Sequence, residues 1–192
     1  MNICLYGASS TEIDNTYISV TEELGALLAQ HGHSLVYGAG GAGLMGAAAR
    51  GVKRGGGAVV GVVPKFLKVD GVLFDGCDEM IFTETMRERK QIMEDRADAF
   101  VVTPGGIGTY EEFFEIYTLK QLGQLHKPIV VFNINGYFDE MLAMLDRSVK
   151  ERFMRAASLD LIAVANTPSG VLEQLRVAVD APSVDIRSTK FV

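Results

Sequence analysis

The stretch of sequence that most constrains the fold is an apolar run that leads directly into a glycine turn. The run is A-F-V-V-T at residues 99–103, and P-G-G-I-G-T-Y-E-E follows at 104–112. This order predicts a buried strand that ends in a turn and opens a helix. The first backbone N–H groups of such a helix have no partners within it, so they can bind an anion above the strand end. A phosphate is the expected anion.

Similar apolar runs alternate with helical stretches along the chain. The predicted strands are 2–7, 34–37, 58–63, 79–82, 99–102 and 128–133, and the predicted helices are about 15–31, 44–54, 84–96, 109–125 and 137–151. Because the runs are continuously apolar, both faces of the sheet must be covered. The pattern predicts an α/β fold, a Rossmann-like doubly wound parallel sheet with helices on both faces. We expect one catalytic domain over residues 1–182 and a loose tail at 183–192.

A cluster of cations precedes the glycine turn, M-R-E-R-K at residues 86–90. At 100° per residue, Met86, Arg89 and Lys90 share the apolar face of the predicted helix, and Arg87 points outward. A guanidinium on an apolar face must find an acceptor or reach water, so we expect Arg89 to meet an anion near the glycine turn. Lys90 fits either a ligand contact or a surface pair with Glu94 at i+4.

The glycine turn itself has a functional and a structural interpretation. Gly105, Gly106 and Gly108 let the backbone approach a ligand closely, and Thr109 can cap the helix. The pattern Thr109-x-x-Glu112 is also a capping box, in which the glutamate reaches back to the amide of the cap residue. Both interpretations remain open from these residues alone.

Composition narrows the class of protein. The chain of 192 residues is 48% hydrophobic and 22% charged, which suits one enzyme-sized domain. Its formal net charge of −6 argues against a nucleic-acid surface. We expect a cytoplasmic protein, because no apolar window could span a membrane and no basic leader is present. Cys4 and Cys77 lack metal-ligand spacing and the acidic residues do not cluster, so no metal or cofactor is expected.

Residues 38–43, G-A-G-G-A-G, fit the dinucleotide motif G-x-G-x-x-G after a strand. That motif requires an acidic residue about 20 positions later, at the end of the next strand, whereas this strand ends Val62-Val63-Pro64. We therefore interpret residues 40–46 as closing the phosphate side or allowing tight helix–sheet packing. Residues 64–78 fit either a mobile flap over the site or a plain connecting loop.

The cationic cluster followed by the glycine turn resembles the paired signature of the LONELY GUY proteins. These are the cytokinin riboside 5′-monophosphate phosphoribohydrolases, long mislabelled as lysine decarboxylases. Three further segments match, Y-G-A-S-S at 6–10, G-G-A-G-L-M-G-A at 40–47, and Q-L-G at 121–123 followed by Lys127-Pro128. The resemblance covers residues 2 to about 152. Arg87 departs from it, since many members carry His at that position.

The resemblance implies hydrolysis of the N-glycosidic bond of an adenosine 5′-monophosphate, N6-modified or not, to free base and ribose 5-phosphate. It implies that Arg89 and Glu112 are catalytic, with Glu112 stabilising an oxocarbenium-like state and activating water. Glu111 is assigned either to the ribose hydroxyls or to solvent. The full set of expected substrate contacts is Ser9, Ser10, Gly41, Met86, Lys90, Gly105, Gly106, Ile107, Gly108, Thr109, Glu111 and Thr118.

Other functions are less favoured. Lysine decarboxylation needs a lysine that holds pyridoxal phosphate, and no lysine stands out for that role. The main alternative is a non-catalytic nucleotide-ligand sensor or carrier, similar to the molybdenum-cofactor carriers. The helix predicted over 109–125 is apolar nearly all round, so one sheet cannot cover it. A second surface must therefore cover it. The resemblance implies that this surface is another copy of the chain, so we expect a homodimer with this helix and the 84–96 helix near the interface.

Overall fold

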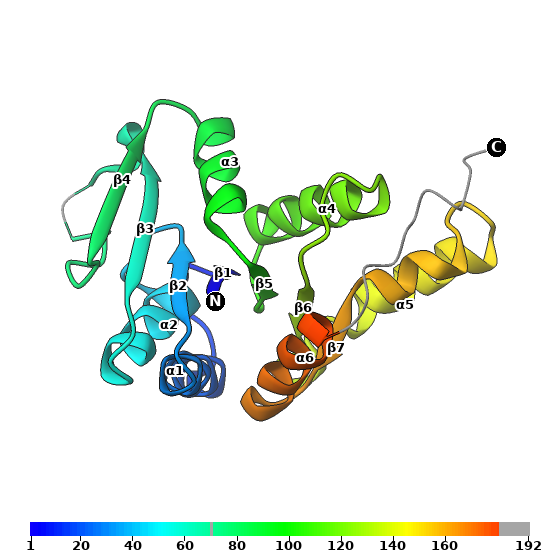
Figure 1. The fold of residues 1–192 in the computed structure, drawn as a ribbon, viewed down its shortest axis with the longest axis horizontal. Coiled ribbons are helices and arrows are strands. Elements are labelled where there is room, and N and C mark those ends of the chain that lie inside the picture. The colour runs from blue at the N-terminus through cyan, green and yellow to red at the C-terminus, as the bar shows by residue number, and fades with distance from the viewer. Residues whose placement is uncertain (70, 181–192) are drawn as a thin grey trace.

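Seven parallel strands form the centre of the molecule in the computed structural model, which describes residues 1–69 and 71–180 (Figure 1). The strands are β1 (Asn2–Tyr6), β2 (Ser34–Tyr37), β3 (Val59–Pro64), β4 (Glu79–Thr83), β5 (Ala99–Val102), β6 (Ile129–Phe132) and β7 (Ala163–Ala165). The α-helices are α1 (Asn15–Gln30), α2 (Gly43–Arg54), α3 (Met86–Arg96), α4 (Ile107–Gln121), α5 (Asp139–Lys150) and α6 (Pro168–Asp180). The tail expected at 183–192 lies outside the described residues.

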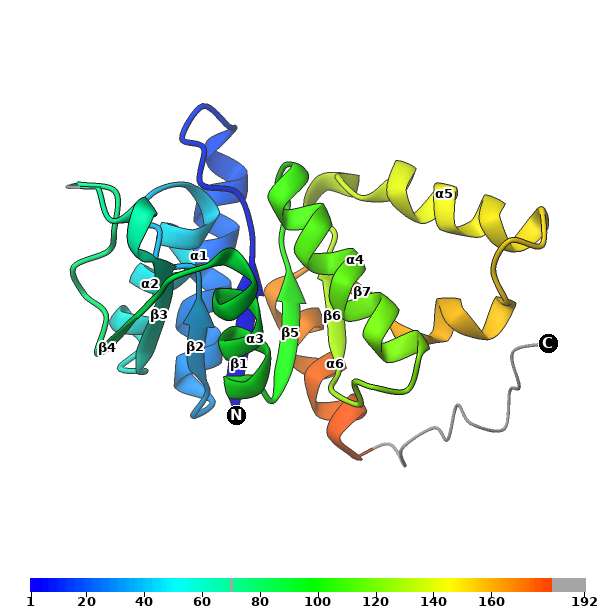
Figure 2. The same cartoon turned by 90° about the horizontal axis from the view of Figure 1, so that it is seen from above.

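The sheet has the order β4-β3-β2-β1-β5-β6-β7, and every neighbouring pair is parallel. Leu24 of α1, Val52 of α2 and Leu175 of α6 belong to the apolar core on one face. Met93 of α3, Phe113 of α4 and Met141 of α5 belong to the core on the other face. The prediction of a doubly wound sheet is therefore confirmed, and Figure 2 shows α3, α4 and α5 over the same side.

The strand order reverses between β1 and β5. From β1 the chain moves outward through β2 and β3 to the edge strand β4, and α3 then carries it back to β5 beside β1. The chain leads from β1 to α1 on one face of the sheet and from β5 to α4 on the other, so these two strands form the topological switch point, where ligands of such sheets bind. The Ala8 amide donates to the Pro104 carbonyl at 3.0 Å, so the loops after β1 and β5 are joined at that point.

The glycines at the start of α2 serve close packing. Gly43 has φ +56°, and a side chain there would approach the Ala8 carbonyl. A methyl group at Gly46 would collide with the Gly41 carbonyl. The Gly41 amide already donates to the Val72 carbonyl at 2.8 Å. These contacts favour the packing interpretation of residues 40–46.

The second half of the 64–78 stretch is hydrogen-bonded to the segment after β2. The short 3₁₀ helix η1 (Lys65–Leu67) begins the stretch, and Leu73 then forms an isolated bridge with Gly40. The Phe74 amide donates to the Ala39 carbonyl at 2.9 Å. This attachment favours a connecting loop over a flap. In the described parts of the chain, none of the helices has the length and apolarity needed to cross a membrane.

The sequence prediction missed two elements, β7 and α6. β7 has only three residues, but residues 161–165 read L-I-A-V-A, an apolar run that could have indicated it. α6 starts with Pro168 directly after Thr167, whose hydroxyl accepts from the Gly170 amide at 3.1 Å. Proline at the first helical position after a threonine is a helix-start signal, and it could have identified α6.

Candidate functional site

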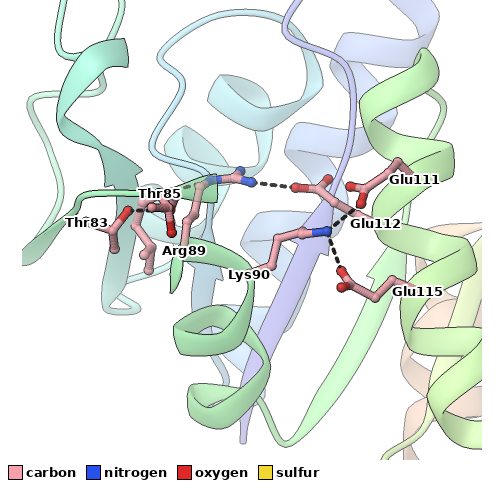
Figure 3. A network of polar contacts seen from close by, with 8 residues as sticks. Thr83, Thr85, Arg89, Lys90, Glu111, Glu112 and Glu115 are labelled. Carbon is pink, nitrogen blue, oxygen red and sulfur yellow. Dashed lines mark hydrogen bonds and ion pairs between the residues drawn. The ribbon is translucent and has the colours of Figure 1, made fainter. Parts of the chain in front are cut away.

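The centre of the candidate site is a buried ion pair between α3 and α4. The Arg89 side chain points from α3 toward Glu112 on α4, and its Nη1 lies 2.7 Å from Glu112 Oε1 (Figure 3). Arg89 Nε donates to the Val62 carbonyl at the end of β3, at 3.1 Å. The two residues are only 7% and 8% exposed. The expectation that Arg89 meets an anion from its apolar helix face is thus met by Glu112.

Gly38 at the end of β2 makes room for this arginine. A methyl group at position 38 would collide with Arg89 Nη2. The first glycine of the apparent dinucleotide motif therefore serves the approach of a guanidinium in this structure. Nη2 donates to no acceptor among the residues that the structure describes, so it is available to a ligand.

A second cation of α3 contacts α4 next to the first. Lys90 Nζ pairs with Glu111 and also with Glu115, at 2.8 Å from Glu115 Oε2. Figure 3 shows both cations of α3 directed at carboxylates of α4. Burial works to lower the pKa of Lys90, but the hydrogen bonds to Glu111 and Glu115 raise it on balance. Lys90 therefore pairs across the two helices and not with Glu94, and it engages the carboxylate expected at the ribose hydroxyls.

The capping-box interpretation of the glycine turn is wrong. α4 begins at Ile107 with Gly106 as its N-cap and without a side-chain cap, so Thr109 lies inside the first turn. Glu112 is correspondingly free to bind Arg89. A threonine cap does occur at α3, where Thr85 Oγ1 accepts from the Glu88 amide at 3.1 Å. That cap starts α3 at Met86, two residues later than expected.

The first turn of α4 is open. The amides of Gly106, Ile107, Gly108 and Thr109 have no hydrogen-bond acceptor within the described ranges, and Ile107 is 84% exposed. The space above Gly106 and Gly108 is empty, because a methyl group at either would touch nothing within 4 Å. Gly105 is buried instead, and a methyl group there would collide with Thr109 Oγ1. Free amides at a helix N-terminus form an anion site.

Burial governs the ionisation of Glu112. Desolvation raises the pKa of its carboxyl group above the ordinary value of 4.5, and the neighbouring charge of Arg89 opposes that shift. A carboxylate with a raised pKa is a stronger base than an exposed one. The site thus combines a basic carboxylate, a fixed guanidinium and a set of free amides.

The other predicted substrate contacts lie outside the Arg89–Glu112 pair and the first turn of α4. Ser9 and Ser10 belong to the loop that Ala8 joins to the glycine turn, and both are exposed. Met86 is exposed in the first turn of α3. Gly41 has its amide occupied, as described above. Thr118 lies farther along α4 and donates to the Phe114 carbonyl at 2.6 Å, which turns its hydroxyl to its own helix.

The sequence analysis did not identify the neighbouring groups that position the site residues. The Val62 carbonyl and Gly38 position Arg89, and Tyr137 donates to the Gly105 carbonyl at 2.7 Å. No local pattern marks a backbone carbonyl as an arginine acceptor. Among the described residues, no group of three His, Cys, Asp or Glu is placed to hold a metal ion.

Comparisons with known proteins give a consistent picture. A family model described as "possible lysine decarboxylase" matches residues 45–175. The chain is 38% identical to the probable cytokinin riboside 5′-monophosphate phosphoribohydrolase LOGL5 of Oryza sativa subsp. japonica, over 94% of this chain and 73% of that protein. It is 39% identical to the cytokinin riboside 5′-monophosphate phosphoribohydrolase of Mycobacterium tuberculosis, over 81% of this chain and 83% of that protein.

Solved structures with the same fold include the molybdenum-cofactor carrier protein of Chlamydomonas reinhardtii. It superposes with a TM-score of 0.71 at 23% identity, over 94% of this chain and 98% of that one. The molybdenum-cofactor binding protein of Rippkaea orientalis gives a TM-score of 0.69 at 22% identity, over 93% of this chain and 96% of that one. At this level of identity, the likeness shows the fold alone.

Proposed function

Because the chain belongs to the LONELY GUY family, we propose that it is a hydrolase that cleaves the N-glycosidic bond of nucleoside 5′-monophosphates. The products are the free base and ribose 5-phosphate, and the substrates are AMP and its N6-modified forms. The observation that carries the proposal is the buried pair of Arg89 and Glu112 beside the open first turn of α4.

The spacing along α4 suits such a substrate. Ile107 and Glu112 are five residues apart, about 7.5 Å along the helix axis. The side chain of Glu112 leans toward the N-terminus of α4, as helical side chains do, and so over Gly108 one turn earlier. A 5′-phosphate on the free amides would place the ribose across Gly108 and its anomeric carbon near Glu112.

In the proposed reaction, the bond from the anomeric carbon to the base nitrogen breaks and its electron pair leaves with the base. A water oxygen bonds to the anomeric carbon, Glu112 accepts the water proton, and the departing base takes up a proton from solvent. Glu112 then releases its proton to solvent, which regenerates the carboxylate. The carboxylate also stabilises the positive charge that develops on the sugar. Arg89 holds this carboxylate in place, and its Nη2 can donate to the substrate.

The test is direct. The purified protein is incubated with AMP and with N6-isopentenyl-AMP, and free base is measured by chromatography. We expect Glu112→Gln to lose at least ~10²-fold in turnover, since general-base catalysis contributes roughly 10²–10⁴-fold. Glu115→Gln, which also removes a carboxylate from α4, is the matched control and should keep its turnover. Equal turnover of Glu112→Gln and wild type would refute the catalytic assignment.

The second candidate function is a nucleotide-ligand carrier, with which the fold shared with the molybdenum-cofactor carriers is compatible. A carrier would bind AMP without releasing base from any nucleoside monophosphate. Lysine decarboxylation has less support, because the lysine nearest the site, Lys90, is held charged by two glutamates. A Schiff-base lysine must instead lose its proton.

A further inference from the structure

The loop after β6 is built to hold one tyrosine beside the glycine turn. Asn133 Oδ1 accepts from the Phe138 amide at 2.7 Å, and Asn133 Nδ2 donates to Asp139 Oδ1 at 2.7 Å. Between these anchors, Asn135 and Gly136 adopt positive φ values of 53° and 71°. A non-glycine residue with positive φ persists only where its surroundings fix it. This loop therefore has one defined conformation.

Tyr137, which this loop presents, is fixed on several sides. Its ring meets that of Tyr17 edge-on at 6.2 Å and that of Phe138 at 5.0 Å. Its hydroxyl donates to the Gly105 carbonyl at 2.7 Å. Burial first, and then a hydrogen bond with Tyr137, raise the pKa of Tyr110 to about 12. Tyr110 lies in the first turn of α4, and its side chain is thus next to that of Tyr137.

The carbonyl that Tyr137 binds belongs to the peptide group that also contains the Gly106 amide. In a planar trans peptide the C=O and N–H bonds point in opposite directions, so fixing the carbonyl fixes the amide. Gly105 and Gly106 both lack a Cβ, and a peptide group between two glycines meets little steric resistance to a flip. A flip would present a carbonyl oxygen to an anion in place of an N–H donor.

We infer that Tyr137 is a positioning residue for phosphate binding, whose hydroxyl keeps the Gly105–Gly106 peptide with its N–H toward the anion. The inference rests on the proposed function, because it assigns the anion to the substrate 5′-phosphate. Tyr137 touches neither the sugar nor the base in this role. Loss of its hydroxyl should therefore weaken phosphate recognition and leave the reacting atoms unaffected.

The experiment compares Tyr137→Phe with Tyr17→Phe, the ring neighbour whose hydroxyl makes no described hydrogen bond. We expect Tyr137→Phe to raise KM for AMP roughly 3–10-fold, the range of one net hydrogen bond, with kcat nearly unchanged. Adenosine lacks the 5′-phosphate, so we expect it to be cleaved far more slowly than AMP, and at the same rate by Tyr137→Phe and wild type. Tyr17→Phe should match wild type on both substrates, and Tyr110→Phe should show a smaller rise in KM for AMP.

Binding of inorganic phosphate, measured by calorimetry, separates this inference from the proposed function. Weaker phosphate binding in Tyr137→Phe supports the inference even if the wild-type protein cleaves no nucleotide, an outcome that would reject only the hydrolase. Unchanged phosphate affinity, or equal losses on AMP and adenosine, would overturn it. All three tyrosine variants keep their rings, so a melting temperature near wild type is expected.

Discussion

Glu112 shows how a single side chain can link burial to pH dependence. Its carboxyl pKa is raised by desolvation, and catalysis requires the ionised form. We expect kcat/KM to fall on acidification with an apparent pKa above the ordinary 4.5. Arg89→Met should move this acid limb to still higher pH in whatever activity remains, because the arginine charge favours the carboxylate. An acid limb below 4.5 would contradict the assignment of Glu112 as the base.

The raised pKa of Glu112 also determines how its ionisation affects the stability of the fold. A group whose pKa is raised in the folded state contributes stability that is present below the unfolded pKa and lost as pH rises through the folded pKa. Protonation of Glu112 therefore does not itself destabilise the fold. Activity should fall at a pH where the melting temperature is still maintained, which a thermal scan over the same buffers can check.

Among the secondary-structure elements, the start of α4 has glycine where alanine would stabilise the helix, and this leaves space for a ligand. Gly108 lies in the first turn, where alanine would favour the helix by roughly 0.4–1 kcal/mol. A methyl group there meets no protein atom and stands on the same helix face as Glu112, one turn before it. We expect Gly108→Ala to raise the melting temperature and to weaken AMP binding.

Gly123 provides the contrast for that prediction. It has φ +69° just after α4, and a side chain there is strained although space is open. Gly123→Ala should lower the melting temperature and leave AMP binding unchanged at a temperature where it is folded. If Gly108→Ala kept wild-type affinity for AMP and for inorganic phosphate, the ligand could not lie over this turn.

The helices and strands also show what local sequence can and cannot predict. All predicted strands and helices occur, because their apolar periodicity directly reflects burial on a two-sided sheet. The pairing of Arg89 could be anticipated from its helix face alone. Its contacts with Gly38 and the Val62 carbonyl could not, since they depend on how α3 crosses β2 and β3. The capping box failed because α4 starts at Ile107, two residues before Thr109.

For the whole molecule, we propose assembly as a homodimer with α3 and α4 near the interface. Fewer apolar residues of α4 are left to form an interface than the sequence suggested, because Phe113, Ile116 and Tyr117 are buried within the chain. Leu122 at the end of α4 is 52% exposed, and Phe153 beyond α5 is 89% exposed. Exposed apolar residues on neighbouring surfaces are typical of an interface between proteins.

Light scattering at micromolar concentration tests this proposal. We expect twice the chain mass for the wild type and a shift toward the chain mass for Leu122→Lys. Val177→Lys, which changes an equally exposed apolar residue on α6 at the opposite face, should keep the wild-type mass. A wild-type protein that scatters as a single chain would disprove the dimer.

The placement of the reactive groups has an evolutionary consequence. Residues 85–112 carry α3, β5, the glycine turn and Glu112, so one short uninterrupted segment encodes the ion pair and the anion site. This chemistry could therefore be gained or lost through changes in one short segment of the gene, while the outer strands β4 and β7 contribute none of these groups. Changes confined to this segment could remove the proposed hydrolytic groups without any rearrangement of the scaffold.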